Sequence, residues 1–196
     1  MNPRPIPPDQ HAGSPTGGSP LFHVALHEPE IPNNTGNIGR TCVATGCALH
    51  LIHPLGFDTS EKACRRAGLD YWPRLQVHHH DSFARFLADA APPRLWLLST
   101  RARRCAFDAD LRPGDALLFG KETRGLPPEI LDAYPDRALM LPMAPTERSL
   151  NLATAVCTVV YEGVRQALAR GELILDDAGR LHRAGAETAG GSPNPP

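Results

Sequence analysis

Apolar residues in this chain gather in short runs that alternate with longer amphipathic stretches, and turn-forming residues separate the two. Short apolar runs bounded by Gly, Pro or Asn predict buried strands, and apolar spacings of three and four predict helices. Strands are expected at 22–27, 48–53, 75–78, 95–100, 116–119 and 138–141. Helices are expected from Asn34 or Thr35 to Gly46 and at 60–68, 82–90, 127–133 and 149–169. This alternation predicts an α/β fold with a mostly parallel sheet flanked by helices on both faces.

The last expected helix, 149–169, is apolar on nearly all sides. Its apolar residues are Leu152, Ala153, Ala155, Val156, Cys157, Val159, Val160 and Val164. One domain of this size rarely encloses a whole helix, so part of this surface is expected to contact a second subunit, which predicts a homodimer. A membrane span is the competing interpretation. The apolar run is shorter than the roughly 18 residues that a span needs and is interrupted by Asn151, Thr154 and Thr158, so no membrane segment is expected.

Both ends of the chain have a composition that does not support a packed core. Residues 1–20 hold six prolines and three glycines, and 184–196 are rich in Gly, Ala and Pro. Such segments cannot bury enough apolar surface to offset the entropy of ordering them. We therefore expect a disordered tail over 1–20, one domain over 21–170, and a largely disordered C-terminal tail over 171–196.

Composition excludes several classes of protein. The net charge is −1, which gives no general attraction to nucleic acid and leaves only local arginine clusters for that purpose. The five cysteines form no CxxC pair and no signal peptide is visible, which indicates reduced thiols in a cytoplasmic protein. Neighbouring residues on a strand point to opposite faces, so His78–His80 cannot easily converge on a metal ion and are expected at the surface. We predict no metal site.

Two late loops carry the candidate chemistry. In 117–127, a buried strand ends at Gly120, and a charged turn leads to a helix opened by Pro127. In 141–152, a Pro-rich loop leads directly into the last helix. Ligands in α/β proteins bind at the carboxyl ends of parallel strands, so these two loops are expected to face one pocket.

The first expected helix carries a polar stripe of Asn33, Asn37 and Arg40, which lie on one face at helical spacing. Taken alone, this stripe is more typical of a solvated face than of a ligand site. The alternative is a surface of amide and guanidinium groups for a sugar or a phosphate, because arginine presents a planar fork to phosphate oxygens.

Three ordered motifs resemble those of a known family. They are Asn34-x-Gly36-Asn37-x-x-Arg40, then Phe119-Gly120-x-Glu122-x-x-Gly125-Leu126-Pro127, then Leu141-Pro142-Met143 followed by Arg148-Ser149-Leu150-Asn151-Leu152. In this order and spacing they resemble the motifs of the SpoU/TrmH class of the SPOUT superfamily of RNA methyltransferases. Segments 28–32 and 65–71 resemble the TrmL (YibK-like) tRNA 2′-O-methyltransferases in that class. The resemblance covers about residues 21–170.

The resemblance implies a fold, a cofactor and a substrate. The family sheet ends in a C-terminal trefoil knot, an exception to unknotted topology, which holds S-adenosylmethionine. By position, the cofactor contacts are Leu98, Gly120, Leu141 and Ser149, with Thr100, Glu122, Met143 and Leu150 nearby. Family members are homodimers in which the interface completes the active site. The acceptor in the TrmL type is the ribose 2′-hydroxyl of the wobble nucleotide, a cytidine or modified uridine, in leucine tRNAs.

The chemistry agrees with these residues. Methyl transfer from a sulfonium to a hydroxyl needs in-line alignment and removal of one proton, and it needs no metal. The catalytic candidates are Arg40, Asn37, Ser149 and Asn151. An arginine has been proposed as the general base in this family. Because a guanidinium holds its proton firmly, orienting the phosphate and stabilising the incipient alkoxide is the simpler role.

Contacts with tRNA are expected from local polar and basic residues. The candidates are Asn33, Arg66, Arg101, Arg104 and Arg124. Tyr71 or Trp72 either stacks on an unstacked anticodon base or belongs to the core. Two alternatives stay open. One is 2′-O-methylation of another tRNA position or of ribosomal RNA, and the other is a non-catalytic knotted dimer that binds RNA.

Overall fold

The computed structural model describes residues 18–66 and 68–185. Within these ranges a seven-stranded sheet has the order β3-β2-β1-β6-β4-β7-β5, and all neighbouring strands are parallel. Its strands are β1 (His23–His27), β2 (Ala48–Ile52), β3 (Val77–His80), β4 (Leu95–Leu98), β5 (Arg104–Cys105), β6 (Ala116–Phe119) and β7 (Ala138–Met140). The α-helices are α1 (Pro32–Thr45), α2 (Glu61–Arg66), α3 (Phe83–Ala90), α4 (Pro128–Ala133) and α5 (Leu152–Ala169). The expectation of an α/β fold with a mostly parallel sheet is confirmed.

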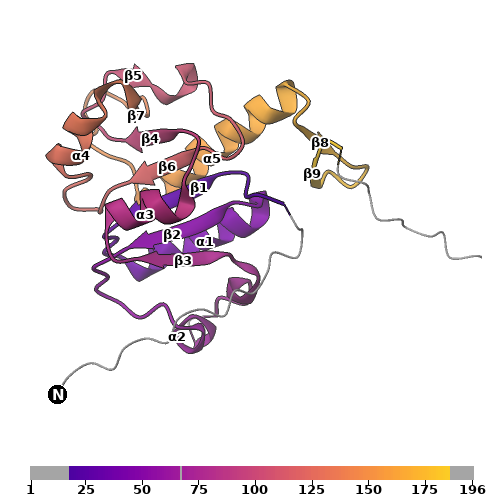
Figure 1. Cartoon of the computed structure of the whole chain (residues 1–196), viewed down its shortest axis with the longest axis horizontal. Helices are drawn as coiled ribbons and strands as arrows, with labels where there is room; N and C mark the ends of the chain where they lie inside the picture. The colour runs from indigo at the N-terminus through magenta and orange to yellow at the C-terminus, as the bar shows by residue number, and fades with distance from the viewer. Residues whose placement is uncertain (1–17, 67, 186–196) are drawn as a thin grey trace, which may run out of the picture.

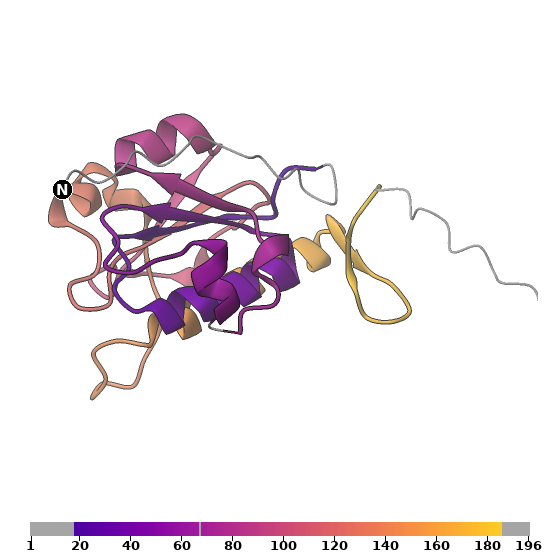
Figure 2. The same ribbon diagram turned by 90° about the horizontal axis from the view of Figure 1, so that it is seen from below.

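Helices cover both faces of the sheet. Figure 2 shows α1 and α5 on one side and α3 on the other. Alternate residues of β1 separate the two layers: Val24 and Leu26 pack in the core beneath α1 and α5, whereas Ala25 packs with Phe86 of α3. Burial on both faces explains why the central strands are continuous apolar runs rather than alternating ones.

Helix α5 is fixed against the sheet by one close approach and one buried amide. A Cβ atom at Gly163 would lie 2.4 Å from the ring of Phe22, so only glycine allows this contact. The side chain of Gln166 accepts the Leu111 N–H at 3.0 Å and donates to the Ala109 carbonyl at 2.9 Å. The opposite face keeps Tyr161 exposed. No helix in the described ranges has the length and apolar character that crossing a membrane demands.

Strand β7 lies between β4 and β5, although it follows both in sequence. The five residues 99–103 therefore cross the carboxyl end of β7, and the Ser99 N–H donates to the Leu139 carbonyl at 2.9 Å. Figure 1 shows this upper part of the sheet, with α4 beside it. After β7 the chain continues through the loop 141–151 to α5.

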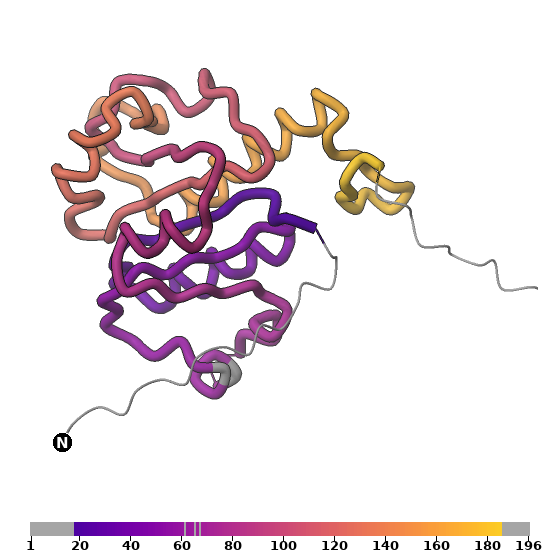
Figure 3. The backbone as a smooth tube through the Cα atoms, viewed as in Figure 1, coloured from indigo at the N-terminus to yellow at the C-terminus, as the bar shows by residue number. Residues whose placement is uncertain are grey.

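Several boundaries differ from expectation. The strand expected at 75–78 is β3 at Val77–His80, because pairing with β2 outweighs the apolar residue Leu75, which ends a 3₁₀ turn (Trp72–Arg74). The two residues of β5 were missed. Residues 171–185, expected in a disordered tail, contain the antiparallel pair β8 (Leu173–Leu175) and β9 (Leu181–Arg183). Figure 3 shows this hairpin beyond the end of α5. The tails over 1–17 and 186–196 lie outside the described residues.

Three strands carry a row of histidines on the face that α3 covers. His23 Nδ1 lies 2.9 Å from His50 Nε2, and His50 Nδ1 lies 2.9 Å from His80 Nε2. His80 Nδ1 lies 3.1 Å from a carboxylate oxygen of Asp89, and His78 stacks on His50. Neutral imidazoles that each donate from Nδ1 satisfy the three contacts that run from His23 through His50 and His80 to Asp89. His80 is buried, so its expected surface location was wrong, although the side chains of neighbouring histidines do point to opposite faces.

This histidine row predicts that stability falls in mild acid. Burial, followed by the nearby histidines, lowers the pKa of His50 from 6.5 to about 2, and burial lowers the pKa of His23 as well. Below about pH 6.5, His50 and His23 are therefore protonated in the unfolded chain but stay neutral in the folded chain. The free energy of unfolding should decrease by about 1.4 kcal/mol per pH unit for His50 alone between about pH 6 and 4. Chemical denaturation at a series of pH values measures this slope.

The matched variants are His50→Gln and His182→Gln, the latter on the hairpin. Slopes are compared rather than absolute stabilities, because the first variant also disturbs the core. His50→Gln should flatten the pH profile, and His182→Gln should leave it as in the wild type. A wild-type slope in His50→Gln would contradict the assignment.

Candidate active site

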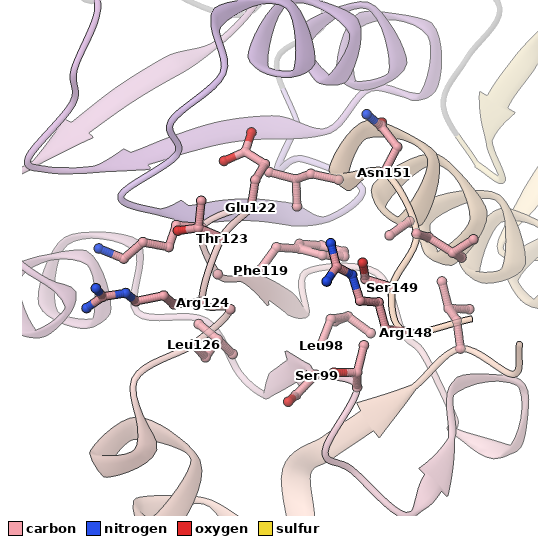
Figure 4. Close-up of a pocket in the computed structure, with 18 of the residues that line it drawn as sticks. Leu98, Ser99, Phe119, Glu122, Thr123, Arg124, Leu126, Arg148, Ser149 and Asn151 are labelled. Atoms are coloured by element: carbon pink, nitrogen blue, oxygen red, sulfur yellow. The ribbon is translucent and has the colours of Figure 1, made fainter. Parts of the chain in front are cut away.

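A cavity of about 740 Å³ opens at the carboxyl ends of β4, β6 and β7. Its walls come from the ends of these strands, the loops that follow them and the start of α5 (Figure 4). All eight residues expected to contact the cofactor lie in its lining: Leu98, Thr100, Gly120, Glu122, Leu141, Met143, Ser149 and Leu150. The two late loops therefore do face one pocket.

The loop 120–126 closes tightly on itself. A Cβ atom at Gly120 would lie 2.0 Å from the carbonyl carbon of Gly125, so position 120 accepts only glycine. Gly125 has a φ of 69°, a left-handed conformation that glycine adopts without steric cost, and its N–H donates to the Lys121 carbonyl at 2.8 Å. The two glycines of the second motif thus shape one wall of the cavity.

Glu122 holds this loop against the entrance to α1. Its carboxylate accepts the Glu30 N–H at 2.8 Å, the Ile31 N–H at 3.3 Å and the side-chain amide of Asn34 at 2.9 Å. Helix α1 begins at Pro32 and has no cap from its own side chains, so the expected cap by Asn34 or Thr35 was wrong. A carboxylate from another loop supplies the negative charge that a helix N-terminus favours.

Asn34 joins this loop to the start of α5. Its side-chain oxygen accepts a hydrogen bond from the Asn151 amide at 2.9 Å, while its own amide donates to Glu122. Asn151 in turn caps α5, because its side-chain oxygen accepts the N–H groups of Ala153 and Thr154. The helix therefore begins at Leu152 rather than at the expected residue 149, and Ser149 stays in the loop. One chain of hydrogen bonds links the three motifs.

This arrangement predicts the effect of Glu122→Ala. Three N–H groups lose their acceptor, and the loop 120–126 loses its link to α1. Two of these groups are exposed to water, which replaces the carboxylate, so we expect a stability loss of only about 1 kcal/mol. Displacement of the cavity wall should weaken binding of the cofactor that the sequence motifs lead us to expect, S-adenosylmethionine, by about tenfold or more, as measured by calorimetry.

Glu147→Ala is the matched control, because Glu147 is exposed on the neighbouring loop and does not line the cavity. It should bind the same ligand as the wild type does. Unchanged binding by Glu122→Ala would show that the carboxylate does not hold the cavity in shape.

The structure distributes the other predicted catalytic and RNA-binding residues among three hollows and the exposed surface. Ser149, Asn151, Arg101 and Arg124 line the cavity. Asn33 and Asn37 line a second pocket of about 340 Å³ between α1 and the segment 57–72. Arg104 lines a third hollow, beside α4, with Arg101, and Arg66 is exposed on α2.

Arg40 lies outside the cavity of its own chain. It is exposed on α1, its guanidinium lies 3.5 Å from the Asp70 carboxylate, and it packs 4.4 Å from the centre of the Tyr71 ring. The stripe of Asn33, Asn37 and Arg40 is therefore exposed along its length, as a solvated face would be. The Tyr71 ring beneath Arg40 restricts the positions that the Arg40 guanidinium can occupy.

The aromatic residues after α2 belong to the core. Tyr71 and Trp72 are 2% and 7% exposed, and the Tyr71 hydroxyl donates to the Gly36 carbonyl. Stacking of Tyr71 on a base is therefore excluded, because no face of its ring is free. Of the two interpretations drawn from the sequence, the core location holds for Tyr71. Trp72 is also buried in the core but lines the second pocket.

Two residues of the site were not among the sequence candidates. Asn34 is buried at the junction of the three motifs. Arg148 lines the cavity, and Figure 4 shows its side chain among Phe119, Leu98 and Ser149. Both residues stand inside quoted motifs, which was the available signal. Their long-range contacts, however, are not visible in sequence.

The lining suits a nucleoside-type ligand that carries an anionic group. Leu98, Phe119 and Leu126 offer apolar walls, while Arg101 and Arg148 supply cationic groups. Glu122, the acidic residue among the lining side chains, already accepts three N–H groups. The apolar walls therefore suit the flat ring of such a ligand, and the arginines suit its carboxylate.

The sequence profile of the SpoU rRNA Methylase family matches residues 21–161. A relative from Saccharophagus degradans, named tRNA (cytidine(34)-2'-O)-methyltransferase, is 50% identical over 147 residues, which cover 74% of this chain and 96% of the relative.

Solved structures agree with that match. One, described as structural insights into the 2-OH methylation of C/U34 on tRNA, has a TM-score of 0.71 and 47% identity, and the alignment covers 78% of this chain and 100% of the other. The SpoU methyltransferase AviRb from Streptomyces viridochromogenes, in complex with the cofactor AdoMet, has a TM-score of 0.67 and 26% identity, with 84% and 67% covered.

Proposed function

The chain belongs to the SpoU rRNA Methylase family, and on that premise we propose that it transfers a methyl group from S-adenosylmethionine to tRNA. The acceptor is the ribose 2′-hydroxyl of the wobble nucleotide, a cytidine or a modified uridine, in leucine tRNAs. Relatives named for methylation of cytidine 34 support this choice of substrate. A tRNA substrate also agrees with the cytoplasmic location expected from the sequence.

One observation carries the proposal. Residues from three motifs, far apart in sequence, line a single cavity at the carboxyl ends of the parallel strands. S-adenosylmethionine supplies a methyl group on a sulfonium when it is bound there. The eight lining residues named above would hold it there. The apolar wall and the cationic rim fit its ring and its carboxylate.

We assign the catalytic roles from the chemistry of each side chain and from its place around the site. Arg40 grips the phosphate next to the target ribose and stabilises the negative charge that develops on the 2′-oxygen. Asn37, one turn away on the same exposed face, orients the ribose. Ser149 lies at the cavity and contacts the hydroxyl. Asn151 positions that loop, since its oxygen caps α5 and its amide binds Asn34.

We further propose a homodimer in which Arg40 of one protomer serves the cavity of its partner. Arg40 does not line its own cavity. Ile31, Leu150 and Tyr161 are large apolar residues with 44%, 43% and 48% of their surface exposed, around the mouth of the cavity and on α5. A second copy that covers them removes this surface from water and brings the two parts of the site together.

Complementation between subunits tests this arrangement. Arg40→Ala and Ser149→Ala are each expected to be inactive as homodimers. In a heterodimer purified by two affinity tags, one site receives both intact residues, so about half of the wild-type activity per dimer should return. A heterodimer as inactive as both parents would show that the two residues act within one chain.

The remaining family features belong to the same proposal. The crossover 99–103 over β7 supports a C-terminal trefoil knot, and residues 21–170 form the catalytic unit. Asn33, Arg66, Arg101, Arg104 and Arg124 contact the anticodon stem and loop. Of these, Arg104 packs 5.3 Å from the centre of the Trp96 ring, which presents its guanidinium at the surface.

Nucleoside mass spectrometry of leucine tRNA tests the proposed function. Purified protein, S-adenosylmethionine and unmodified leucine tRNA should yield one 2′-O-methylated nucleotide, at position 34. Transcripts with 2′-deoxycytidine at that position should remain unmodified, because the acceptor is missing. Methylation at any other position, or of ribosomal RNA alone, would overturn the assignment of substrate.

A further inference from the structure

We propose that the second pocket, between α1 and the segment 57–72, binds the pyrimidine base of the target nucleotide. This inference rests on the proposed function and names where the base goes while its ribose is methylated. The α1–α2 pocket, as we call it, has a volume of about 340 Å³, enough for one base and part of its sugar.

The walls of the α1–α2 pocket suit a flat ring with polar edges. Phe57, Leu69 and Trp72 contribute apolar surface, and Asn37 and Asp58 stand among the polar lining residues. Single-stranded RNA is recognised by bases that leave the stack and enter such sites, where apolar faces cover the ring and polar groups pair with its edge.

The hydroxyl group of Thr35 lacks a hydrogen-bond partner, and we infer that the bound base provides one. Thr35 is among the residues that line the pocket, it is 1% exposed, and its hydroxyl oxygen has no hydrogen-bond partner among the described residues. Burying a hydroxyl without a partner costs free energy, so such groups are rare in proteins unless a ligand or water completes them. A pyrimidine edge, which carries both donors and acceptors, completes it.

Asp58 gives the pocket a preference for cytosine. The Ser60 N–H donates to its carboxylate at 2.7 Å and the Ser60 hydroxyl at 3.0 Å, and these hydrogen bonds lower the pKa of Asp58. A carboxylate accepts from the exocyclic amine of cytosine, whereas uracil presents a carbonyl oxygen at the same place. The same lining thus favours cytidine and admits a uridine less readily.

The location connects the pocket to the reacting groups. Asn33 and Asn37 line the pocket, and Arg40 follows them on the same exposed face of α1. Asn34, between Asn33 and Thr35, lines the cofactor cavity instead. A nucleotide whose base fills the α1–α2 pocket therefore has its sugar and phosphate along the stripe that ends at Arg40.

Thr35→Val tests the site, because it removes the hydroxyl and keeps the shape. Binding of an anticodon stem-loop RNA with cytidine, uridine or an abasic site at position 34 is measured by fluorescence anisotropy. Loss of one buried hydrogen bond should weaken binding of the cytidine RNA by about five- to tenfold and leave the abasic RNA unaffected. The melting temperature should stay equal or rise, since the variant no longer buries an unpartnered hydroxyl. A purely structural role for Thr35 would lower it.

Ala63, also in the lining, gives an independent test that avoids the α1 motif. Ala63→Met fills the pocket and should make cytidine and abasic RNAs bind equally, whereas Ala63→Ser should behave as the wild type.

Asp58→Asn should shift the ratio of methylation rates from cytidine toward uridine. Affinity for S-adenosylmethionine should remain within about twofold in all of these variants, because none of the residues lines the cofactor cavity.

The outcomes separate the two proposals. If the wild type methylates position 34 and all variants match it, the base pocket is wrong and the proposed function stands. If the wild type methylates no tRNA yet prefers the cytidine RNA, and Ala63→Met removes that preference, the pocket stands and the enzymatic function falls. If the wild type binds cytidine and abasic RNAs equally, the base pocket is overturned.

Discussion

Replacing Arg40 by alanine is expected to lower the rate of 2′-O-methyl transfer to tRNA by about a hundred- to a thousandfold, the usual effect of removing one charge-stabilising donor. Arg40 lies on the exposed face of α1, where Asp70 and the Tyr71 ring hold its guanidinium without burying it. Its removal leaves the cofactor cavity intact, so the dissociation constant for S-adenosylmethionine should change by less than about twofold. Single-turnover methylation and calorimetry measure the two quantities.

Arg40→Lys separates charge from geometry. Lysine keeps the positive charge but not the planar fork, so it should recover only a small part of the lost rate. Arg74→Ala is a control on an exposed arginine of the neighbouring 3₁₀ turn. Equal losses of rate and cofactor affinity in Arg40→Ala would contradict the role given to Arg40.

Asp115→Ala is expected to lower the free energy of unfolding by about 3 kcal/mol or more, the largest stability effect of a single substitution that we predict. Asp115 is fully buried at the start of β6. Its carboxylate accepts two hydrogen bonds from Arg94, at 2.8 and 2.7 Å, one from the Trp96 indole at 2.9 Å and one from the Arg112 N–H at 2.8 Å. Alanine leaves these donors without their acceptor and leaves Arg94 only the exposed carboxylate of Asp110, 3.5 Å away.

Urea denaturation measures this loss. Asp110→Ala is the matched control, because Asp110 also lies within reach of Arg94 and Arg112 but is 52% exposed. Water replaces its carboxylate, so the control should cost less than about 1 kcal/mol. Similar losses in both variants would mean that burial of Asp115 adds nothing to its contribution.

The sequence was informative where structure depends on neighbours along the chain. The apolar runs at β1, β2 and β6 predicted buried strands, because a strand covered on both faces must be apolar at nearly every residue. The glycine at position 120 and the proline at 127 bounded a loop that the structure places at the carboxyl end of β6. The surface location expected for His78–His80 was wrong at His80, although neighbouring strand residues do point to opposite faces. A partner on each side of its ring permits burial.

The resemblance to a known family predicted more of the site residues than local sequence patterns did. The resemblance named eight residues that the structure gathers around one cavity. The quoted motifs also contained Asn34 and Arg148 without revealing what these residues contact. Periodicity alone assigned Asn33, Asn37 and Arg40 to a solvated face, and in one chain that is where they lie.

By itself, the sequence of this protein determined the α/β class, most of the elements and the residue types available at the loops, since each depends on side chains a few positions apart. Tertiary structure alone decided that β7 enters between β4 and β5 and that Glu122 accepts a hydrogen bond from Asn34 of α1, 88 residues away. It also decided that Arg40 faces away from its own cavity. These features are distances between remote segments, and such distances follow from how the helices and the sheet pack, which no local pattern of residues encodes.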